Sequence, residues 1–260
     1  NFMDIVFNKQ KIHIATRYRK SGKELVVFLH GLGCTKESFA NAWEVDELQN
    51  YSLLSIDFLG HGDSSKPKNF SYTMEEHAKI IAQVLRQKNY ESIHIIAHSM
   101  GGVIGLLLAK QLESKLKTFV NIEGNLISED CGILSRKTMS VSYEEFREIL
   151  FNQFQKKMAN SKEKGSQLWA KQSKQTDPYA FYKSAESLVF WSDSGKLLKK
   201  FQSLSIKKAY IYGKKHFSNL TKLLNKLSGI PTFGVSKSGH FVMNDNPHDF
   251  YKLLLKVIQK

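Results

Sequence analysis

The sequence has little cysteine and no long apolar run, and both shortages limit the class of protein. It contains two cysteines, Cys34 and Cys131, which are too few for a disulfide framework and fit a reducing compartment. Its apolar runs are too short, and too often interrupted by polar residues, to span a membrane. No pattern typical of a secretory signal occurs near residue 1. We therefore expect a cytoplasmic protein without stable membrane insertion.

Arginine is also scarce, although the chain carries a formal net charge of +14. A basic excess of this size first suggests nucleic acid or another anionic partner. Nearly all of the excess is lysine, however, and arginine occurs only at positions 17, 19, 86, 136 and 147. Proteins that read bases or clamp phosphates favour arginine because its guanidinium is a planar fork. We interpret the lysines as solvated surface and expect no nucleic-acid partner.

The usual fingerprints of cofactor binding are missing as well. A phosphate-binding loop needs Lys-Ser/Thr after its glycines, and a dinucleotide site needs G-x-G-x-x-G; the sequence has neither. No His, Cys or acidic residues occur at the spacing of a known metal motif. The sequence therefore predicts a protein that uses no cofactor and no metal.

What the chain does contain is an alternation of apolar runs and helical patterns. Residues 4–8 and 11–19 alternate apolar and polar positions, which predicts two antiparallel strands. Further strands are predicted at the mostly apolar runs 25–29, 52–58, 93–96, 117–122, 208–212 and 231–235. Helical patterns between them imply right-handed crossovers. The prediction is an α/β fold: a mostly parallel central sheet with helices on both faces.

Helix boundaries can be read at two places. Thr73 with Glu76 three positions later is typical of a capping box and predicts a helix that ends near Lys88. A final amphipathic helix is predicted from Pro247 to the end of the chain.

Residues 126–205 interrupt this alternation. Helix-like patterns at 143–160 and 178–190, many polar residues and two of the three tryptophans occur there. We expect a helical cap inserted into a core made of residues 1–125 and 206–260. Aromatic side chains of such a cap can line an apolar pocket, but most of them form the core of the cap itself.

The segment Ser92–Leu106 is the most informative stretch. A β-branched run ends abruptly in small residues around Ser99, and an apolar helical pattern follows. A serine on such a turn is held on a strained bend that exposes its hydroxyl, while the N-terminus of the helix directs N–H groups at the reacting atom. An ordinary glycine-rich connection would show the same small residues, so the motif alone leaves both interpretations open.

Three more motifs occupy defined places along the chain: His30-Gly31 after an early strand, Gly60-His61-Gly62-Asp63-Ser64 after the next, and Gly239-His240 before the last helix. Together with Ala97-His98-Ser99-Met100-Gly101, they resemble the α/β-hydrolase family over essentially the whole chain. One departure is Ala97, where glycine is usual; alanine is also small enough for the bend.

The resemblance implies a catalytic triad and an oxyanion hole. Ser99 would be the nucleophile, and His240 would take its proton and return it to the leaving group. The backbone N–H groups of Leu32 and Met100 would form the oxyanion hole. His30 and His61 would brace the backbone of their loops.

The acid of the triad departs from the usual pattern. The resemblance places an aspartate in the loop after strand 208–212, but no Asp or Glu occurs from Ser194 to Asn244. Glu123 directly follows the strand at 117–122, where some members of the family carry their acid, and we predict that it orients His240. Asp57, which we expect to brace the Gly60-Gly62 loop, remains an alternative. So do Asp245, expected to cap the last helix, and a dyad without an acid.

This resemblance implies a serine hydrolase that cleaves a small carboxylic ester or thioester through an acyl-enzyme, of the carboxylesterase type. A C–C hydrolase, a perhydrolase or an acyltransferase of the same fold would use the same residues. A small-molecule receptor built on a hydrolase scaffold is the alternative from another class. The expected partner is a small acyl substrate; the sequence indicates neither the acyl group, the leaving group nor the oligomeric state.

Overall fold

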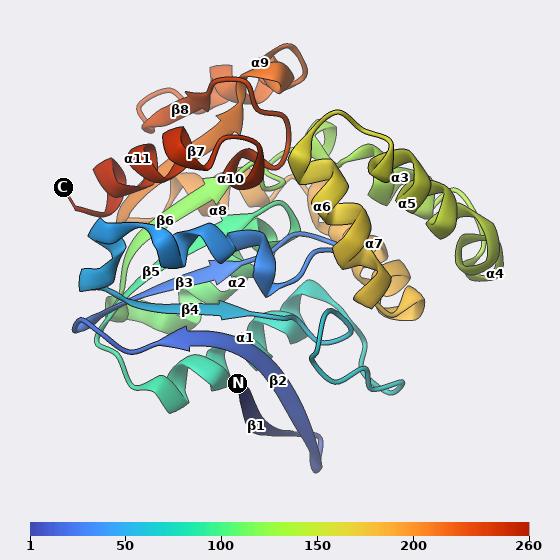
Figure 1. Cartoon of the computed structure of the whole chain (residues 1–260), viewed down its shortest axis with the longest axis horizontal. Coiled ribbons are helices and arrows are strands. Elements are labelled where there is room, and N and C mark those ends of the chain that lie inside the picture. Colours follow the sequence, from blue (N-terminus) through green and yellow to red (C-terminus); the bar gives the residue numbers. More distant parts are fainter. Residues whose placement is uncertain (260) are drawn as a thin grey trace.

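The computed structural model of the chain describes residues 1–259, apart from the side chain of residue 113, and is built around one eight-stranded sheet (Figure 1). The strand order is β1-β2-β4-β3-β5-β6-β7-β8. The strands are β1 (Phe2–Phe7), β2 (Gln10–Arg19), β3 (Glu24–Leu29), β4 (Ser52–Ile56), β5 (Ser92–His98), β6 (Leu116–Ile122), β7 (Lys207–Gly213) and β8 (Thr232–Val235). The predicted α/β fold is confirmed.

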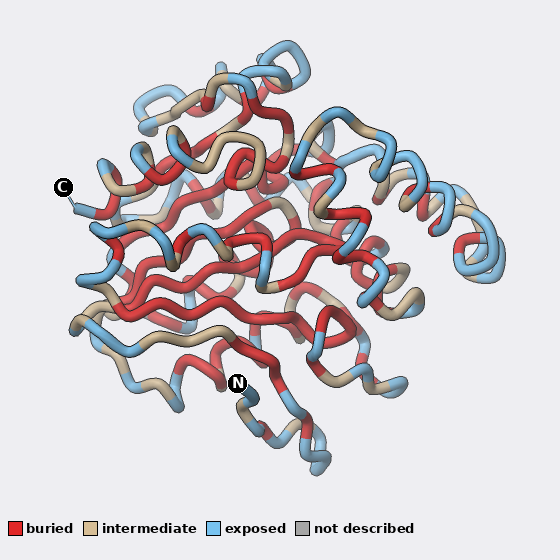
Figure 2. Tube along the Cα trace, viewed as in Figure 1, coloured by how far each residue is buried: buried red, intermediate tan, exposed pale blue. Residues whose placement is uncertain are grey.

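Strand direction follows the predicted pattern. β1 pairs with β2, and β2 with β4, in antiparallel fashion, whereas every pair from β4 to β8 is parallel. A tight turn joins β1 to β2 because Asn8 (φ 47°) and Lys9 (φ 63°) both adopt the left-handed conformation that hairpin turns require. The central strands are buried along nearly their whole length, which explains their continuous apolar sequences (Figure 2).

Helices cover both faces of the sheet (Figure 1). On one face lie α1 (Met74–Lys88), α2 (Met100–Leu112) and α8 (Leu197–Gln202), and on the other lie the 3₁₀ helix η1 (Lys36–Glu44) and α11 (Pro247–Ile258). A second 3₁₀ helix, η2 (Asp46–Asn50), follows η1, and η3 (Glu113–Lys115) follows α2. Two further helices, η7 (Lys214–His216) and α9 (Phe217–Lys226), connect β7 to β8, and α10 (Val242–Asp245) precedes α11. None of the helices described is long and apolar enough to cross a membrane.

The predicted capping box at α1 is only half formed. The Thr73 hydroxyl accepts the N–H of Glu76 at 3.3 Å, as predicted. The Glu76 carboxylate, however, accepts the N–H of Ser71 at 3.2 Å instead of reaching back to Thr73. The N–H of Thr73 donates to the hydroxyl oxygen of Ser71 at 3.3 Å, so the Glu76 carboxylate is not needed there.

Every regular element that the structure describes between β6 and β7 is a helix. These are η4 (Ser128–Asp130), α3 (Ile133–Thr138), α4 (Tyr143–Glu145), the π-helical turn η5 (Phe146–Leu150), α5 (Phe151–Ala159), α6 (Lys164–Gln172), η6 (Ser173–Gln175), α7 (Pro178–Asp193) and α8. Helices α3 to α7 lie beyond the ends of the strands (Figure 1). Phe146, Phe151 and Phe181 form a shared apolar centre there, with ring centroids 5.0–5.3 Å apart.

Helix α8 returns to the core. The ring of Phe201 in α8 lies 6.0 Å from that of Phe119 in β6, and α8 also packs against α2. The segment 126–205, predicted as one cap, therefore contains a helix that covers the sheet. We propose that the cap ends with α7.

Buried histidines link the loop after β4 to α1. His61 and His77 are fully enclosed, and the ring of Phe58 lies 5.4 Å from that of His77. Burial lowers the pKa of His61 to about 4 and that of His77 to about 3, with the neighbouring His61 adding to the effect on His77. Both side chains are therefore neutral in the folded protein at neutral pH.

This burial predicts destabilisation by acid. Below pH ~6.5 the unfolded chain binds protons at these histidines and the folded chain does not, so stability falls as the pH drops toward 4. Each histidine contributes up to about 1.4 kcal/mol per pH unit. His77→Phe should reduce the slope of unfolding free energy against pH by the contribution of one histidine, up to about 1.4 kcal/mol per pH unit. The slope is measured by urea unfolding at several pH values. The exposed His248→Phe is the matched control; equal slopes in all three proteins would contradict the prediction.

Candidate active site

Ser99 occupies the sharp turn between β5 and α2. Its φ of 52° lies in the left-handed region, which is strained for a residue with a side chain. Two backbone hydrogen bonds hold it there: its N–H donates to Ile122 O at 2.9 Å, and its carbonyl accepts the N–H of Gly102 at 2.8 Å. The turn is thus fixed both to the end of β6 and to the first turn of α2, which is the geometry expected of an exposed nucleophile.

The small residues around Ser99 are required by close contacts. A Cβ on Gly101 would lie 2.5 Å from Leu29 O, and one on Gly31 would lie 3.1 Å from the Cβ of Ser99. The loop after β3 therefore packs directly on the serine turn. Ala97, where glycine is usual, is completely buried in β5.

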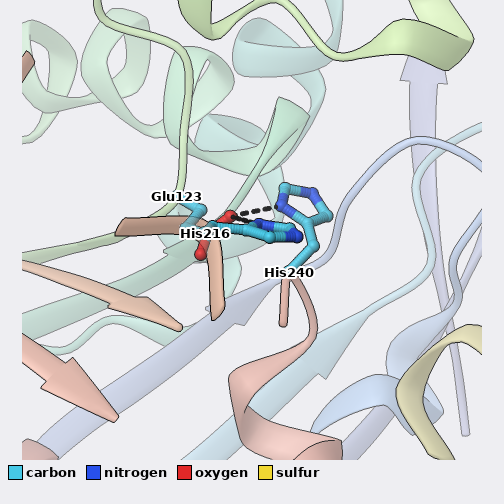
Figure 3. Close-up of side chains that lie close together, drawn as sticks. All are labelled: Glu123, His216 and His240. Carbon is cyan, nitrogen blue, oxygen red and sulfur yellow. Dashed lines mark hydrogen bonds and ion pairs between the residues drawn. The ribbon is translucent and has the colours of Figure 1, made fainter. Parts of the chain in front are cut away.

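His240 and Glu123 meet at the same edge of the sheet. Nδ1 of His240, in the loop after β8, lies 2.7 Å from Oε2 of Glu123 (Figure 3). Glu123 follows β6 directly, has a φ of 43°, and donates its N–H to Ile211 O at 3.0 Å. Glu123 is the carboxylate that the sequence predicted for this contact, and a carboxylate can only accept, so His240 donates its Nδ1–H.

The Glu123 carboxylate receives three hydrogen bonds. Oε1 accepts the N–H of Gly213 at 2.8 Å, and Oε2 accepts from Nδ1 of His216 at 2.9 Å as well as from His240. Burial alone would raise the pKa of Glu123, but the hydrogen bonds from His216 and His240 lower it to about 2. The group is therefore an anion at neutral pH, able to fix the tautomer of His240.

The contact between His216 and Glu123 was not predicted from the sequence. His216 lies in the loop after β7, where the resemblance called for an aspartate, and both imidazoles converge on one oxygen of Glu123 (Figure 3). The hydrogen bond to Glu123 raises the pKa of His216, although burial opposes this. The only signal in the sequence was the position itself: a histidine in a loop that should carry the acid.

His98 holds the loop that carries His240. Its Nε2 lies 2.9 Å from the carbonyl oxygen of His240, and its ring lies 4.6 Å from that of His240. Burial lowers the pKa of His98 to about 3, so the ring is neutral and donates its Nε2–H to the carbonyl. His30 braces its loop as expected: it accepts the N–H of Phe58 at 3.1 Å and bonds to Gly31 O at 2.8 Å. Nδ1 of His61 lies 3.1 Å from Leu59 O.

The two predicted oxyanion donors belong to segments that pack on Ser99. Met100 is the first residue of α2, and Leu32 lies in the loop after β3. The carbonyl of Leu32 accepts the indole N–H of Trp169 from α6 at 2.8 Å. The next residue, Gly33, has a φ of 72°, and a Cβ there would lie 2.8 Å from the Trp169 ring. Helix α6 thus holds the conformation of this loop.

The other two carboxylates considered from the sequence have different partners. Asp57 accepts the N–H groups of Lys36 (2.6 Å) and Asp63 (3.0 Å) and pairs with Nζ of Lys36 at 2.8 Å, so it braces the loop after β4 as expected. The expectation that Asp245 caps the last helix is wrong. Asn246 caps α11, and Asp245 accepts the N–H groups of Gly165 (2.8 Å) and Gly239 (2.9 Å).

Two surface hollows of 570 and 620 Å³ lie away from these residues. The first is lined by the segments that lead into β7 and β8. It therefore lies at the N-terminal ends of these parallel strands, whereas Ser99 follows the C-terminal end of β5. The second lies between η1, η2 and α11. Neither hollow is lined by Ser99, Glu123 or His240, so neither gives the size of a substrate pocket.

Comparison with known proteins fits this arrangement. The family model described as alpha/beta hydrolase fold matches residues 24–246, which is most of the chain. The chain belongs to the α/β-hydrolase family. The resemblance inferred from the four motifs is thereby confirmed.

Individual relatives of this α/β-hydrolase are more distant. The probable lysophospholipase BODYGUARD 5 of Arabidopsis thaliana is 37% identical over 101 residues, or 36% of this chain and 23% of the relative. The putative esterase/lipase 2 of Mycoplasma genitalium is 26% identical over 101 residues, or 39% of this chain and 38% of the relative. These matches therefore span well under half the length of the curated relatives.

Among solved structures, a carboxylesterase of Nitrososphaera gargenis superimposes with a TM-score of 0.81. It is 16% identical, and the superposition covers 99% of this chain and 98% of that one. At this identity the likeness shows a shared fold.

The hydrogen bond between Trp169 in α6 and Leu32 of this α/β-hydrolase can be tested by measurements of stability. Trp169→Phe removes the N–H that the buried Leu32 carbonyl accepts, and should cost about 1–3 kcal/mol of unfolding free energy. Trp191→Phe is the matched control because its buried indole nitrogen has no hydrogen-bond partner among the described residues. Urea unfolding should show the larger loss for Trp169→Phe; equal losses would contradict a structural role for this bond.

Proposed function

We propose that this α/β-hydrolase is a serine hydrolase that cleaves a small carboxylic ester or thioester through an acyl-enzyme. The observation that carries the proposal is the 2.7 Å contact between His240 Nδ1 and the buried anion of Glu123. A neutral serine is a poor nucleophile and requires a base whose tautomer is fixed. With the proton held on Nδ1, the lone pair of Nε2 is free to accept the proton of Ser99.

In the proposed reaction the Ser99 hydroxyl attacks the acyl carbon while Nε2 of His240 takes its proton. The tetrahedral oxyanion is stabilised by the backbone N–H groups of Leu32 and Met100. His240, now an imidazolium stabilised by Glu123, protonates the leaving group as the C–O or C–S bond breaks. Water, deprotonated by His240, then releases the acid and restores Ser99.

Glu123 in this mechanism has the role that an aspartate after β7 has in the common pattern. Two features support this assignment. Its carboxylate is held in place from β7 by the N–H of Gly213, and the alternatives Asp57 and Asp245 are occupied by backbone N–H groups elsewhere. The names of the curated relatives, lysophospholipase and esterase/lipase, fit an ester as the substrate class.

The nucleophile is tested by Ser99→Ala. This variant should abolish turnover of p-nitrophenyl acetate and butyrate and leave the melting temperature nearly unchanged, because alanine and serine are similarly strained at a φ of 52°. A fluorophosphonate probe should label Ser99 in the wild-type protein and leave the variant unlabelled. Retained turnover by the variant would rule out the proposal.

The acid is tested by Glu123→Gln, which preserves the shape of the side chain and removes its charge. Replacing the acid of a triad by its amide in a well-studied serine protease lowers kcat about 10⁴-fold, and we expect a loss of several orders of magnitude here. Asp245→Asn is the comparison, with a smaller loss expected because it does not contact His240 Nδ1. Turnover of Glu123→Gln near the wild-type level would mean that another carboxylate orients His240, or that Ser99 and His240 act as a dyad without an acid.

The reaction type is tested by product analysis. Acyl-enzyme turnover in the presence of hydrogen peroxide or an alcohol distinguishes simple hydrolysis from perhydrolysis and acyl transfer, because each acceptor leaves a different product. We expect the free carboxylic acid to predominate.

A further inference from the structure

Three side chains of metal-ligand type converge at one point, and one of them is the proposed base, His240. One ligand atom each from Glu123, His216 and His240 lies within 4.8 Å of the other two. They come from the ends of three separate structural units: the residue after β6, the loop after β7 and the loop after β8. No spacing in the sequence could reveal this cluster, because the three residues are far apart along the chain.

The donor set matches a particular class of ion. Two imidazoles and one carboxylate with an open position suit Zn²⁺ and related divalent transition metals, whereas Mg²⁺ and Ca²⁺ prefer oxygen ligands. Both imidazoles have 34% of their side chains exposed, which leaves room for a water molecule as fourth ligand.

The distances need only a small adjustment. Donors bound tetrahedrally to zinc at about 2.0–2.1 Å lie about 3.4 Å from one another. The Nδ1 atoms of His216 and His240 are now 2.9 and 2.7 Å from Oε2 of Glu123, so they must move away from it by about 0.5 and 0.7 Å. The two nitrogens lie within 4.8 Å of each other and must reach the same separation of about 3.4 Å. The carboxylate, held by Gly213, can stay in place.

The local charge favours a cation although the whole chain is basic. Glu123 is an anion next to both imidazoles, and the carboxylate of Asp245 also acts on His216. The ammonium of Lys215, the nearest basic neighbour of His216 in sequence, is paired with Glu163 at 3.1 Å.

We propose that Glu123, His216 and His240 bind a divalent transition-metal ion of the zinc type, and that the bound ion switches the hydrolase off. The binding site stands on the cluster itself, and the inhibitory effect rests on the proposed function of His240. The ion is an inhibitor in this proposal and takes no part in the reaction.

The inhibition follows from the tautomer of His240. A metal ion on Nδ1 uses the lone pair of that nitrogen, so the single proton of the neutral ring must move to Nε2. Nε2 then carries a proton and cannot accept one from Ser99. The ion also takes the Glu123 oxygen that would stabilise the imidazolium. No bond to substrate forms or breaks, and removing the ion restores the original tautomer.

Binding is tested on the metal-free Ser99→Ala protein, in which the three ligands are intact and no chemistry occurs. Isothermal titration with Zn²⁺ should show one saturable site, and Mg²⁺ should show none. His216→Asn in the same protein should weaken Zn²⁺ binding at least about tenfold, because the amide can donate to Glu123 as Nδ1 does and is a poor zinc ligand.

The matched control is His13→Asn. Nδ1 of His13 lies 2.6 Å from Oδ1 of Asp4, so this surface pair has the same donors without a second histidine. The control should leave Zn²⁺ binding unchanged. His216→Gln repeats the test should His216→Asn fail to fold, as judged by its thermal transition. Absence of a saturable site, or binding that does not depend on His216, would overturn the proposal.

Inhibition is tested on the wild-type protein with p-nitrophenyl butyrate. Zn²⁺ should lower turnover, and a chelator should restore it. His216→Asn should raise the Zn²⁺ concentration that half-inhibits turnover by the same factor by which it raises the dissociation constant for Zn²⁺. If the wild-type protein shows no esterase turnover, the proposed function fails while the calorimetric result still decides the metal site. If Zn²⁺ binds at His216 and turnover is unaffected, the inhibitory role is wrong.

Discussion

The backbone hydrogen bonds that continue the sheet past its strand ends are the constraint on which the site depends. Ser99 donates its N–H to Ile122 of the neighbouring strand, and Glu123 donates its N–H to Ile211 of the strand after that. Both residues have a positive φ, and both are the first residue after a strand. Each strained residue is thus tied to the next strand along. Because β5, β6 and β7 are adjacent and parallel, these ties place the nucleophile turn and the carboxylate at one edge of the sheet.

The sequence predicted the sheet well because the signals there are local. Buried parallel strands require continuous apolar runs, and the glycine-rich turns after them require small residues, so both can be read from short windows. Strands at 25–29, 117–122 and 208–212 appear in the structure within one or two residues of the prediction. The pairing of His240 with Glu123 was also accessible, since the missing acid after β7 left few candidates.

Other features depend on contacts that a local pattern does not contain. The sequence alone could not show that His216 shares an oxygen with His240, because the two residues approach only after β7 and β8 pair. Asp245 precedes a proline-initiated helix and is a residue type that often caps helices. Its carboxylate nevertheless accepts the N–H groups of Gly165 and Gly239, because the start of α6 lies beside it. Helix α8 is too short to be assigned to core or cap by its periodicity. In each case, tertiary packing decided between local alternatives.

The attachment of helix α6 has a consequence for the loops around Ser99. Helix α6 is bonded at one end to the loop of His240, through Gly165 and Asp245, and near its other end to the loop of Leu32, through Trp169. An outward movement of α6 would break both contacts and disturb the loops that carry His240 and Leu32. Helix α6 therefore joins the loop of His240 to the loop of Leu32, so a shift of one loop would be transmitted to the other through this helix.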